Sequence, residues 1–193
     1  MGRVIFGAIP AAIAMFLIGF IWYATPLAKL GFASLDNAQA AAVQQSMAAN
    51  LPGTGTYAVP GVDTAEQTSM FSQGPIATIH YNSGGFAAMD PGALLGGLVF
   101  YFVIALLLGL ALIGIDRRVP DFPSRAKLVV IFAVAASAFI HLSEPIFYHH
   151  DWPHFLYLFV GDALMLSAAG LIIARWFLPK GESAAPGDAP TEV

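Results

Sequence analysis

Cysteine is absent from the 193 residues, and charge is scarce. Without cysteine the chain has neither disulfides nor thiolate metal ligands. Only 10% of its residues are charged, against about 25% in an average soluble domain, which is too few to cover a soluble core. The net charge of −4 argues against nucleic acid as a partner, because binding phosphates requires a basic surface. These shortages exclude a soluble, disulfide-built or nucleic-acid-binding protein.

Catalytic fingerprints are also missing. The chain has no G-x-S-x-G, H-E-x-x-H, P-loop or Rossmann motif. The segment Leu51–Gly55 (LPGTG) contains Gly-Thr-Gly, but no lysine follows, so it predicts a turn. We therefore expect a protein that is not an enzyme.

Apolar residues, by contrast, make up 58% of the chain. They form four long stretches: Val4–Ala24, Ala93–Ile115, Leu128–Leu142 and Phe155–Ile173. About 20 apolar residues cross a hydrocarbon core of about 30 Å, so each stretch predicts a transmembrane helix. The first stretch follows Arg3 but is longer than the 7–15 residues of a signal peptide, so we expect an uncleaved anchor.

The basic residues predict the direction of the four spans. With four spans, only Lys29 lies on one side of the membrane. The other seven basic residues lie on the opposite side: Arg3, Arg117, Arg118, Arg125, Lys127, Arg175 and Lys180. Cytoplasmic loops are enriched in Lys and Arg, so both termini should be cytoplasmic in a multi-pass protein of the bacterial inner membrane. Trp22, Tyr23, Tyr148 and Trp152 then lie at the outer interface, where aromatic residues gather.

The segment between the first two spans is too long for a simple loop, which predicts an ordered periplasmic α+β cap. Asp36–Asn50 has a helical composition, and Thr56–Val59 and Pro75–Tyr81 are rich in strand formers. The predicted organisation is transmembrane helix 1 over 1–24, the cap over 25–91, helix 2 over 92–115, a cytoplasmic loop over 116–127, helix 3 over 128–145, a periplasmic link over 146–154, helix 4 over 155–178 and a disordered cytoplasmic tail over 179–193.

Small residues recur at helical spacing in every span, for example Gly92-x-x-x-Gly96 and Ala133-x-x-x-Ser137. Small residues let membrane helices approach closely, which lipid alone does not drive. The expected fold is therefore an all-α membrane protein, an antiparallel bundle of four transmembrane helices with the small α+β cap between helices 1 and 2. The same stripes could equally serve a partner subunit.

Polar residues are concentrated on two helix faces. Ser137, His141 and Glu144 share one face of the third span. Asp162 lies about 12 Å beyond His154 along the fourth. An ionisable group at that depth normally faces the protein interior. We therefore predict that Ser137 and Asp162 are buried polar residues, and that His141, together with Glu144, forms a structural hydrogen bond to Asp162.

The histidines allow a second interpretation. Imidazole and carboxylate groups bind transition metals, and a pair of histidines can hold haem. The candidate ligands are His80, His141, Glu144, His150 and His154. The alternative for His149 and His150 is that they are ordinary interfacial residues.

A cluster of basic residues lies between the second and third spans. It comprises Arg117, Arg118, Arg125 and Lys127. These residues are candidates for binding anionic lipid head groups on the cytoplasmic face. Setting the topology would by itself account for them.

Three short motifs in the segment after the first span carry a resemblance. They are Gly55-Thr56-Tyr57, Gly74-Pro75 and the turn from Gly85 to Met89, and they follow Phe20–Pro26 (FIWYATP) at the end of that span. This pattern resembles a family of four-span bacterial inner-membrane proteins of unknown function, with a periplasmic Gly-x-Tyr and Gly-Pro strand segment. The resemblance covers about a third of the chain, and it implies a bacterial inner membrane but no activity.

The leading functional hypothesis is a non-enzymatic accessory, assembly or stabilising subunit of a larger membrane complex. Its partners would be the lipid bilayer and another membrane protein or further copies of itself, and no nucleic acid. One alternative is a protein that binds a metal or haem through the histidines. A second alternative is a small proton-coupled transporter that uses Asp162.

Overall fold

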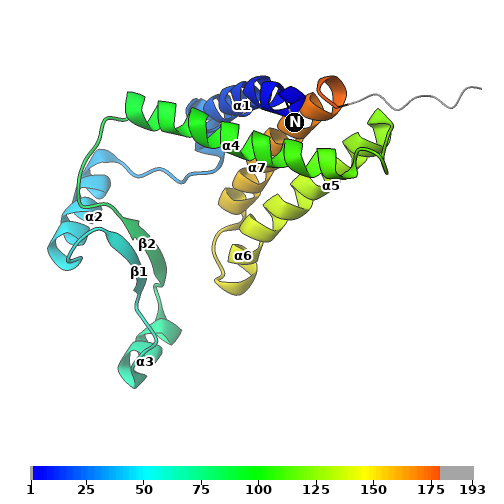
Figure 1. Cartoon of the computed structure of the whole chain (residues 1–193). Coiled ribbons are helices and arrows are strands. Elements are labelled where there is room, and N and C mark those ends of the chain that lie inside the picture. The colour runs from blue at the N-terminus through cyan, green and yellow to red at the C-terminus, as the bar shows by residue number, and fades with distance from the viewer. Residues whose placement is uncertain (1, 179–193) are drawn as a thin grey trace, which may run out of the picture. The chain divides into compact units, whose positions relative to one another are not determined.

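A computed structural model describes residues 2–178 of the chain (Figure 1). It divides into two compact units, each described separately below. Residues 2–33 and 91–178 form the first, here called the membrane unit, and Ser34–Asp90 form the second, here called the inserted unit. The predicted tail over 179–193, with Lys180, lies outside the described residues.

Four helical segments in the membrane unit are long and apolar enough to cross a membrane, which indicates a multi-pass membrane protein. They are α1 (Gly2–Tyr23), α4 (Pro91–Ile115), α5 (Phe122–His141) continued by the short α6 (Ser143–Phe147), and α7 (Trp152–Trp176). After α1 the chain forms the short 3-10 helix η1 (Pro26–Leu30). Because η1 belongs to the membrane unit, the inserted unit begins later than the predicted boundary at residue 25.

Two helices begin earlier in the chain than the predicted boundaries at residues 128 and 155, and each begins at an aspartate cap. The side chain of Asp121 accepts a hydrogen bond from the Ser124 N–H at 2.8 Å, so α5 begins at Phe122. Asp151 accepts one from the His154 N–H in the same way, so α7 begins at Trp152. The apolar stretches alone did not reveal these polar first turns, in which the cap satisfies otherwise unpaired N–H groups.

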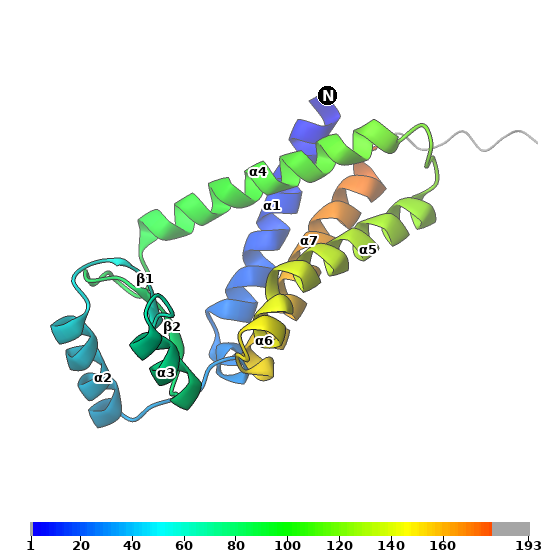
Figure 2. The ribbon, with the colours of Figure 1, turned by 90° about the horizontal axis from the view of Figure 1, so that it is seen from below.

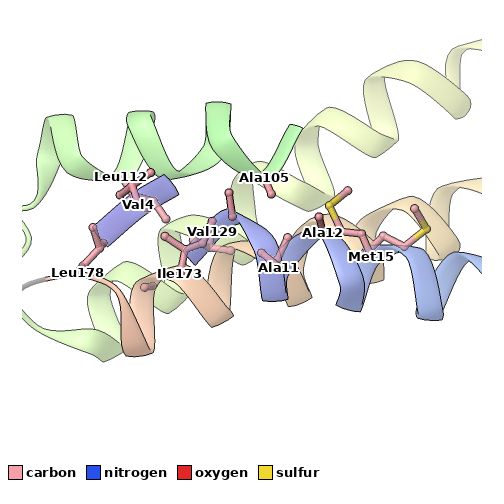
Figure 3. Close-up of a cluster of buried hydrophobic side chains, with 13 residues drawn as sticks. Val4, Ala11, Ala12, Met15, Ala105, Leu112, Val129, Ile173 and Leu178 are labelled. Carbon is pink, nitrogen blue, oxygen red and sulfur yellow. The ribbon is translucent and has the colours of Figure 1, made fainter. Parts of the chain in front are cut away.

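Small residues bring neighbouring helices of the membrane unit together. α1 contacts α4 and α7, and α7 also contacts α5 (Figure 2). A Cβ atom added at Gly109 of α4 would collide with Val4, and one at Gly170 of α7 would lie 2.5 Å from a methyl carbon of Val129. Figure 3 shows the buried cluster formed at these approaches. Its members include Val4, Ala8, Ala11, Ala105, Val129, Ala169 and Ile173.

The first half of α4 departs from the expected compact packing. In Figure 2 it diverges from α1 towards its N-terminal end. A Cβ atom added at Gly96 or Gly97 would meet nothing within 4 Å, and Leu95 is 65% exposed. The Gly92-x-x-x-Gly96 stripe therefore does not bring α4 close to another helix at Gly96.

The inserted unit contains two helices and a two-stranded sheet. The elements are α2 (Asn37–Asn50), β1 (Gly55–Val59), α3 (Ala65–Gln73) and β2 (Ala77–Tyr81). The strands pair antiparallel, with Tyr57 opposite Ile79. The predicted first helix and both strands are confirmed within two residues. The sequence analysis missed α3.

Local hydrogen bonds hold the two helices of the inserted unit at their starts. Asp36 and Gln39 form a reciprocal capping box at α2, and Thr64 and Gln67 form one at α3. Packing contributes little, since none of the residues 34–90, all of which the structure describes, is buried. This unit thus has regular elements without a core of its own.

Candidate functional site

Asp162 is the centre of a polar cluster that joins three helices of the membrane unit. Its Oδ1 atom accepts a hydrogen bond from the Tyr23 hydroxyl at the end of α1, at 2.9 Å. Its Oδ2 atom lies 2.7 Å from Nε2 of His141 at the end of α5. Tyr23, His141 and Asp162 are called the polar cluster below. The predicted contact between His141 and Asp162 is confirmed, but Glu144 does not join it and lies beside His150 instead. Tyr23 was assigned only to the aromatic interface.

The polar cluster is only partly covered by the chain itself. The side chain of His141 is 13% exposed, but that of Asp162 is 34% exposed. Asp162 lies ten residues into α7, or about 15 Å along the helix. An ionisable side chain at such a position normally faces protein or a water-filled cavity. A third of the Asp162 side chain therefore lacks cover from its own chain, so Asp162 is partly buried and not buried as predicted.

Two aromatic residues fix α1 against α7 beside the polar cluster. Trp22 donates a hydrogen bond from Nε1 to the Tyr157 carbonyl at 3.1 Å, and the Tyr157 hydroxyl donates to the Trp22 carbonyl. Their rings stack with centroids 5.1 Å apart. Gly161 permits this approach, because an added Cβ would lie 2.5 Å from the Tyr23 hydroxyl and 2.6 Å from the Trp22 ring.

The other histidines have separate partners. His154 lies with Nδ1 at 2.7 Å from the Gly31 carbonyl oxygen, which ties the start of α7 to the end of η1. His150 lies 3.2 Å from Glu144, within ion-pair distance, but the angles do not make a hydrogen bond. His80 belongs to the inserted unit, where Nδ1 is 3.1 Å from the Thr56 hydroxyl. His149 has a positive φ of 55° in the turn before α7.

These positions do not assemble the predicted metal ligands. Among residues 2–178, no group of three or more His, Cys, Asp or Glu side chains could hold a metal ion. The candidate ligands are divided between His141 with Asp162, His150 with Glu144, and two histidines bonded elsewhere. The side-chain arrangement therefore gives the metal or haem hypothesis no support.

Ser137 lies one helical turn before His141 and is fully buried, as predicted. Its hydroxyl has no hydrogen-bond partner within the described residues. Serine in a helix often bonds the carbonyl four residues earlier, so this unpaired oxygen is unusual. It adds a polar atom to the same helix as His141 without joining the polar cluster.

Chemically, the polar cluster is suited to holding helices together. A carboxylate that accepts hydrogen bonds from a phenol and an imidazole orients both donors, and the His–Asp pair is like the orienting half of a catalytic triad. In residues 2–178, however, no serine or threonine hydroxyl is hydrogen-bonded to His141. The cluster therefore links α1, α5 and α7.

The basic residues between α4 and α5 divide into two kinds. Arg125 is only 3% exposed and donates from Nε to the Val119 carbonyl at 2.7 Å and from Nη2 to the Asp116 carbonyl at 3.2 Å. It fastens the connection between the helices, so its burial argues against the predicted contact with lipid. Arg117, Arg118 and Lys127 are exposed.

Comparisons with protein-family models, with curated proteins and with solved structures found no match to this chain. The resemblance to a four-span bacterial family therefore stays a prediction, and no activity can be transferred from a relative.

Proposed function

We propose that the protein is a non-enzymatic integral membrane protein that acts as an assembly or stabilising subunit of a larger complex. The inserted unit is the part that holds the partner. One observation carries this proposal: residues 34–90 form four regular elements without a single buried residue.

A unit without a core needs a surface to pack against. A two-stranded sheet alone is marginally stable at best in water, and buried apolar area is the main favourable term in folding. The inserted unit instead leaves many large apolar side chains open to solvent. These include Val43, Val62, Met70, Phe71, Ile76, Phe86 and Met89, of which Phe86 is the most exposed at 76%. A partner that covers them would supply the missing burial.

Charge favours a different protein over a second copy as that partner. The inserted unit carries four acidic residues (Asp36, Asp63, Glu66 and Asp90) and no lysine or arginine. Two such units would repel each other, whereas a neutral or basic face would be attracted. The partly exposed side chain of Asp162 and the open first half of α4 offer further surface within the membrane unit.

The distribution of basic residues supports a bacterial inner-membrane location with both termini in the cytoplasm. In that orientation the inserted unit extends into the periplasm. The transporter alternative has less support, because both oxygens of Asp162 already accept hydrogen bonds.

Native mass measurement after mild extraction tests the proposal. The intact protein should leave the membrane with another protein at fixed stoichiometry. Hydrogen exchange in residues 34–90 should then be slower in the complex than in the separated chain. The Phe86→Ala variant should lose most of the partner, and Phe139→Ala, at an 83% exposed phenylalanine of α5, should retain it. A lone monomer whose residues 34–90 exchange as slowly as the helix cores would overturn the proposal.

A further inference from the structure

A cavity of about 380 Å³ opens where α4 ends and α5 begins. Its lining combines two kinds of side chain. Arg118 and Lys127 supply positive charge, and Val119, Leu128 and Ile131 supply apolar surface. A site that binds a soluble anion does not need this apolar part.

Both cations of the cavity are available to a ligand. Arg118 and Lys127 are exposed, and neither side chain has an ion pair or a hydrogen bond within residues 2–178. Arg125 is different because its guanidinium is buried against loop carbonyls. The two free charges are therefore not needed to hold the local fold.

The single acidic residue of the lining is already engaged. Asp121 accepts the Ser124 backbone N–H, and this hydrogen bond lowers the pKa of the Asp121 carboxyl below its ordinary value. The Asp121 carboxylate thus interacts with the N-terminus of α5, where the helix dipole favours negative charge. The lining therefore has two positive side chains without a partner among the described residues and one negative side chain, Asp121, that serves as a helix cap.

The lining residues of α5 lie at the depths that a lipid head group and its acyl chain occupy in a membrane. Helix α5 rises about 1.5 Å per residue, so Ile131 lies about 13 Å beyond Phe122 along a helix that can cross the membrane. Lys127 lies between them, and its long stem lets the ammonium reach back towards the interface. Charge therefore lies at the interfacial end of the cavity, and apolar surface lies deeper.

We propose that this cavity binds an anionic phospholipid. The phosphate lies between Arg118 and Lys127, and an acyl chain runs along Leu128 and Ile131. The lining favours a lipid over free phosphate because the apolar side chains contact only a molecule with a hydrocarbon tail.

Native mass spectrometry of the full chain in zwitterionic nanodiscs, titrated with phosphatidylglycerol, tests this proposal. Each of Arg118→Gln and Lys127→Gln should weaken lipid binding about fivefold, and the double variant about 25-fold. Arg117→Gln is the matched control, since Arg117 is exposed and carries the same charge but does not line the cavity. It should change binding less than twofold. Unchanged helical circular dichroism would show that the variants are folded.

Two further arms separate the possible results. Glycerophosphate at the same concentration should not displace the lipid, and Ile131→Ser should weaken lipid binding. Displacement by glycerophosphate, with no effect of Ile131→Ser, would identify a phosphate site and overturn the lipid proposal. Equal loss in Arg117→Gln and in the cavity variants would reduce the effect to general surface charge, which also overturns it.

Discussion

The membrane unit and the inserted unit reach regular structure by different physical routes. In the membrane unit, helices approach so closely that glycines at 109, 161 and 170 have no room for a Cβ atom. In the inserted unit, two capping boxes and one strand pairing fix the elements, and nothing is buried. Caps and strand pairing thus accompany regular elements in the inserted unit, but a buried core is present only in the membrane unit.

This difference indicates where each region obtains its stability. A helix cap contributes about 1 kcal/mol, which is small against the conformational entropy of ordering a segment. The membrane unit adds close packing and a hydrogen-bonded cluster between α1, α5 and α7. The inserted unit has only its helix caps and the β1–β2 pairing, and on our proposal a partner adds the rest.

The largest effect should come from filling the closest helix approach. In Gly161→Val the new side chain would collide with Trp22 and Tyr23. Overpacking of this kind destabilises by about 3 kcal/mol, and the separation of α1 from α7 should expose the polar cluster. Unfolding of the purified protein in mixed micelles, followed by circular dichroism, measures the change.

Gly96→Val is the matched control, because Gly96 lies in a helix of the same unit with open space around it. The same substitution there should alter stability by less than about 0.5 kcal/mol. Equal losses at the two glycines would mean that close approach does not distinguish them.

A smaller effect should follow from removing the shared acceptor of the polar cluster. Asp162→Ala removes the acceptor that the Tyr23 hydroxyl and the His141 imidazole share, at a cost of about 2 kcal/mol, and leaves the hydroxyl only the longer contact with the Leu158 carbonyl at 3.4 Å. Tyr23→Phe removes one of the two bonds and should cost about 0.6 kcal/mol. The same unfolding assay applies, and hydrogen exchange in the inserted unit should not change with either variant.

The double variant Tyr23→Phe with Asp162→Ala provides the check on that assignment. Once Asp162 is gone, Tyr23→Phe should have little further effect, because it then removes only the longer contact of the hydroxyl with the Leu158 carbonyl at 3.4 Å. Strict additivity of the two losses would show that the hydrogen bond contributes nothing. Tyr148→Phe, at an exposed tyrosine, should be neutral.

Most of the fold was predictable from the sequence because its signals are local. Long apolar stretches predicted the four spanning helices, and composition predicted α2 and both strands. The third helix, α3, was missed although Thr64-x-x-Gln67 is a capping-box pattern, because its short polar sequence has no apolar periodicity. The divergence of α4 was also missed, since Gly92-x-x-x-Gly96 has the same pattern whether or not a helix lies opposite.

The candidate site was predictable only in part. Helical spacing along the third and fourth spans predicted that His141 meets Asp162, because a short link makes these spans neighbours. Tyr23 could not be assigned in the same way. It comes from a span far away in the sequence, and its aromatic ring at a helix end was already explained by the interface. The separation of the histidines into pairs depends on side-chain direction, which spacing does not determine.

The most local effect is that of a helix cap, and one aspartate cap from each unit can be compared. Asp36 caps α2 and Asp121 caps α5, each by accepting the N–H of the third residue that follows. Asp36→Ala should destabilise α2 by about 1 kcal/mol and speed hydrogen exchange along the whole helix, because no buried residue holds it. In Asp121→Ala only the first turn of α5 should exchange faster, since Val129 and Ala133 are buried in the membrane unit beyond it. Exchange mass spectrometry of both variants measures this contrast, and Asp36→Asn should restore slow exchange in α2. Faster exchange along the whole of α5 in Asp121→Ala would mean that packing stabilises this helix no more than its cap does.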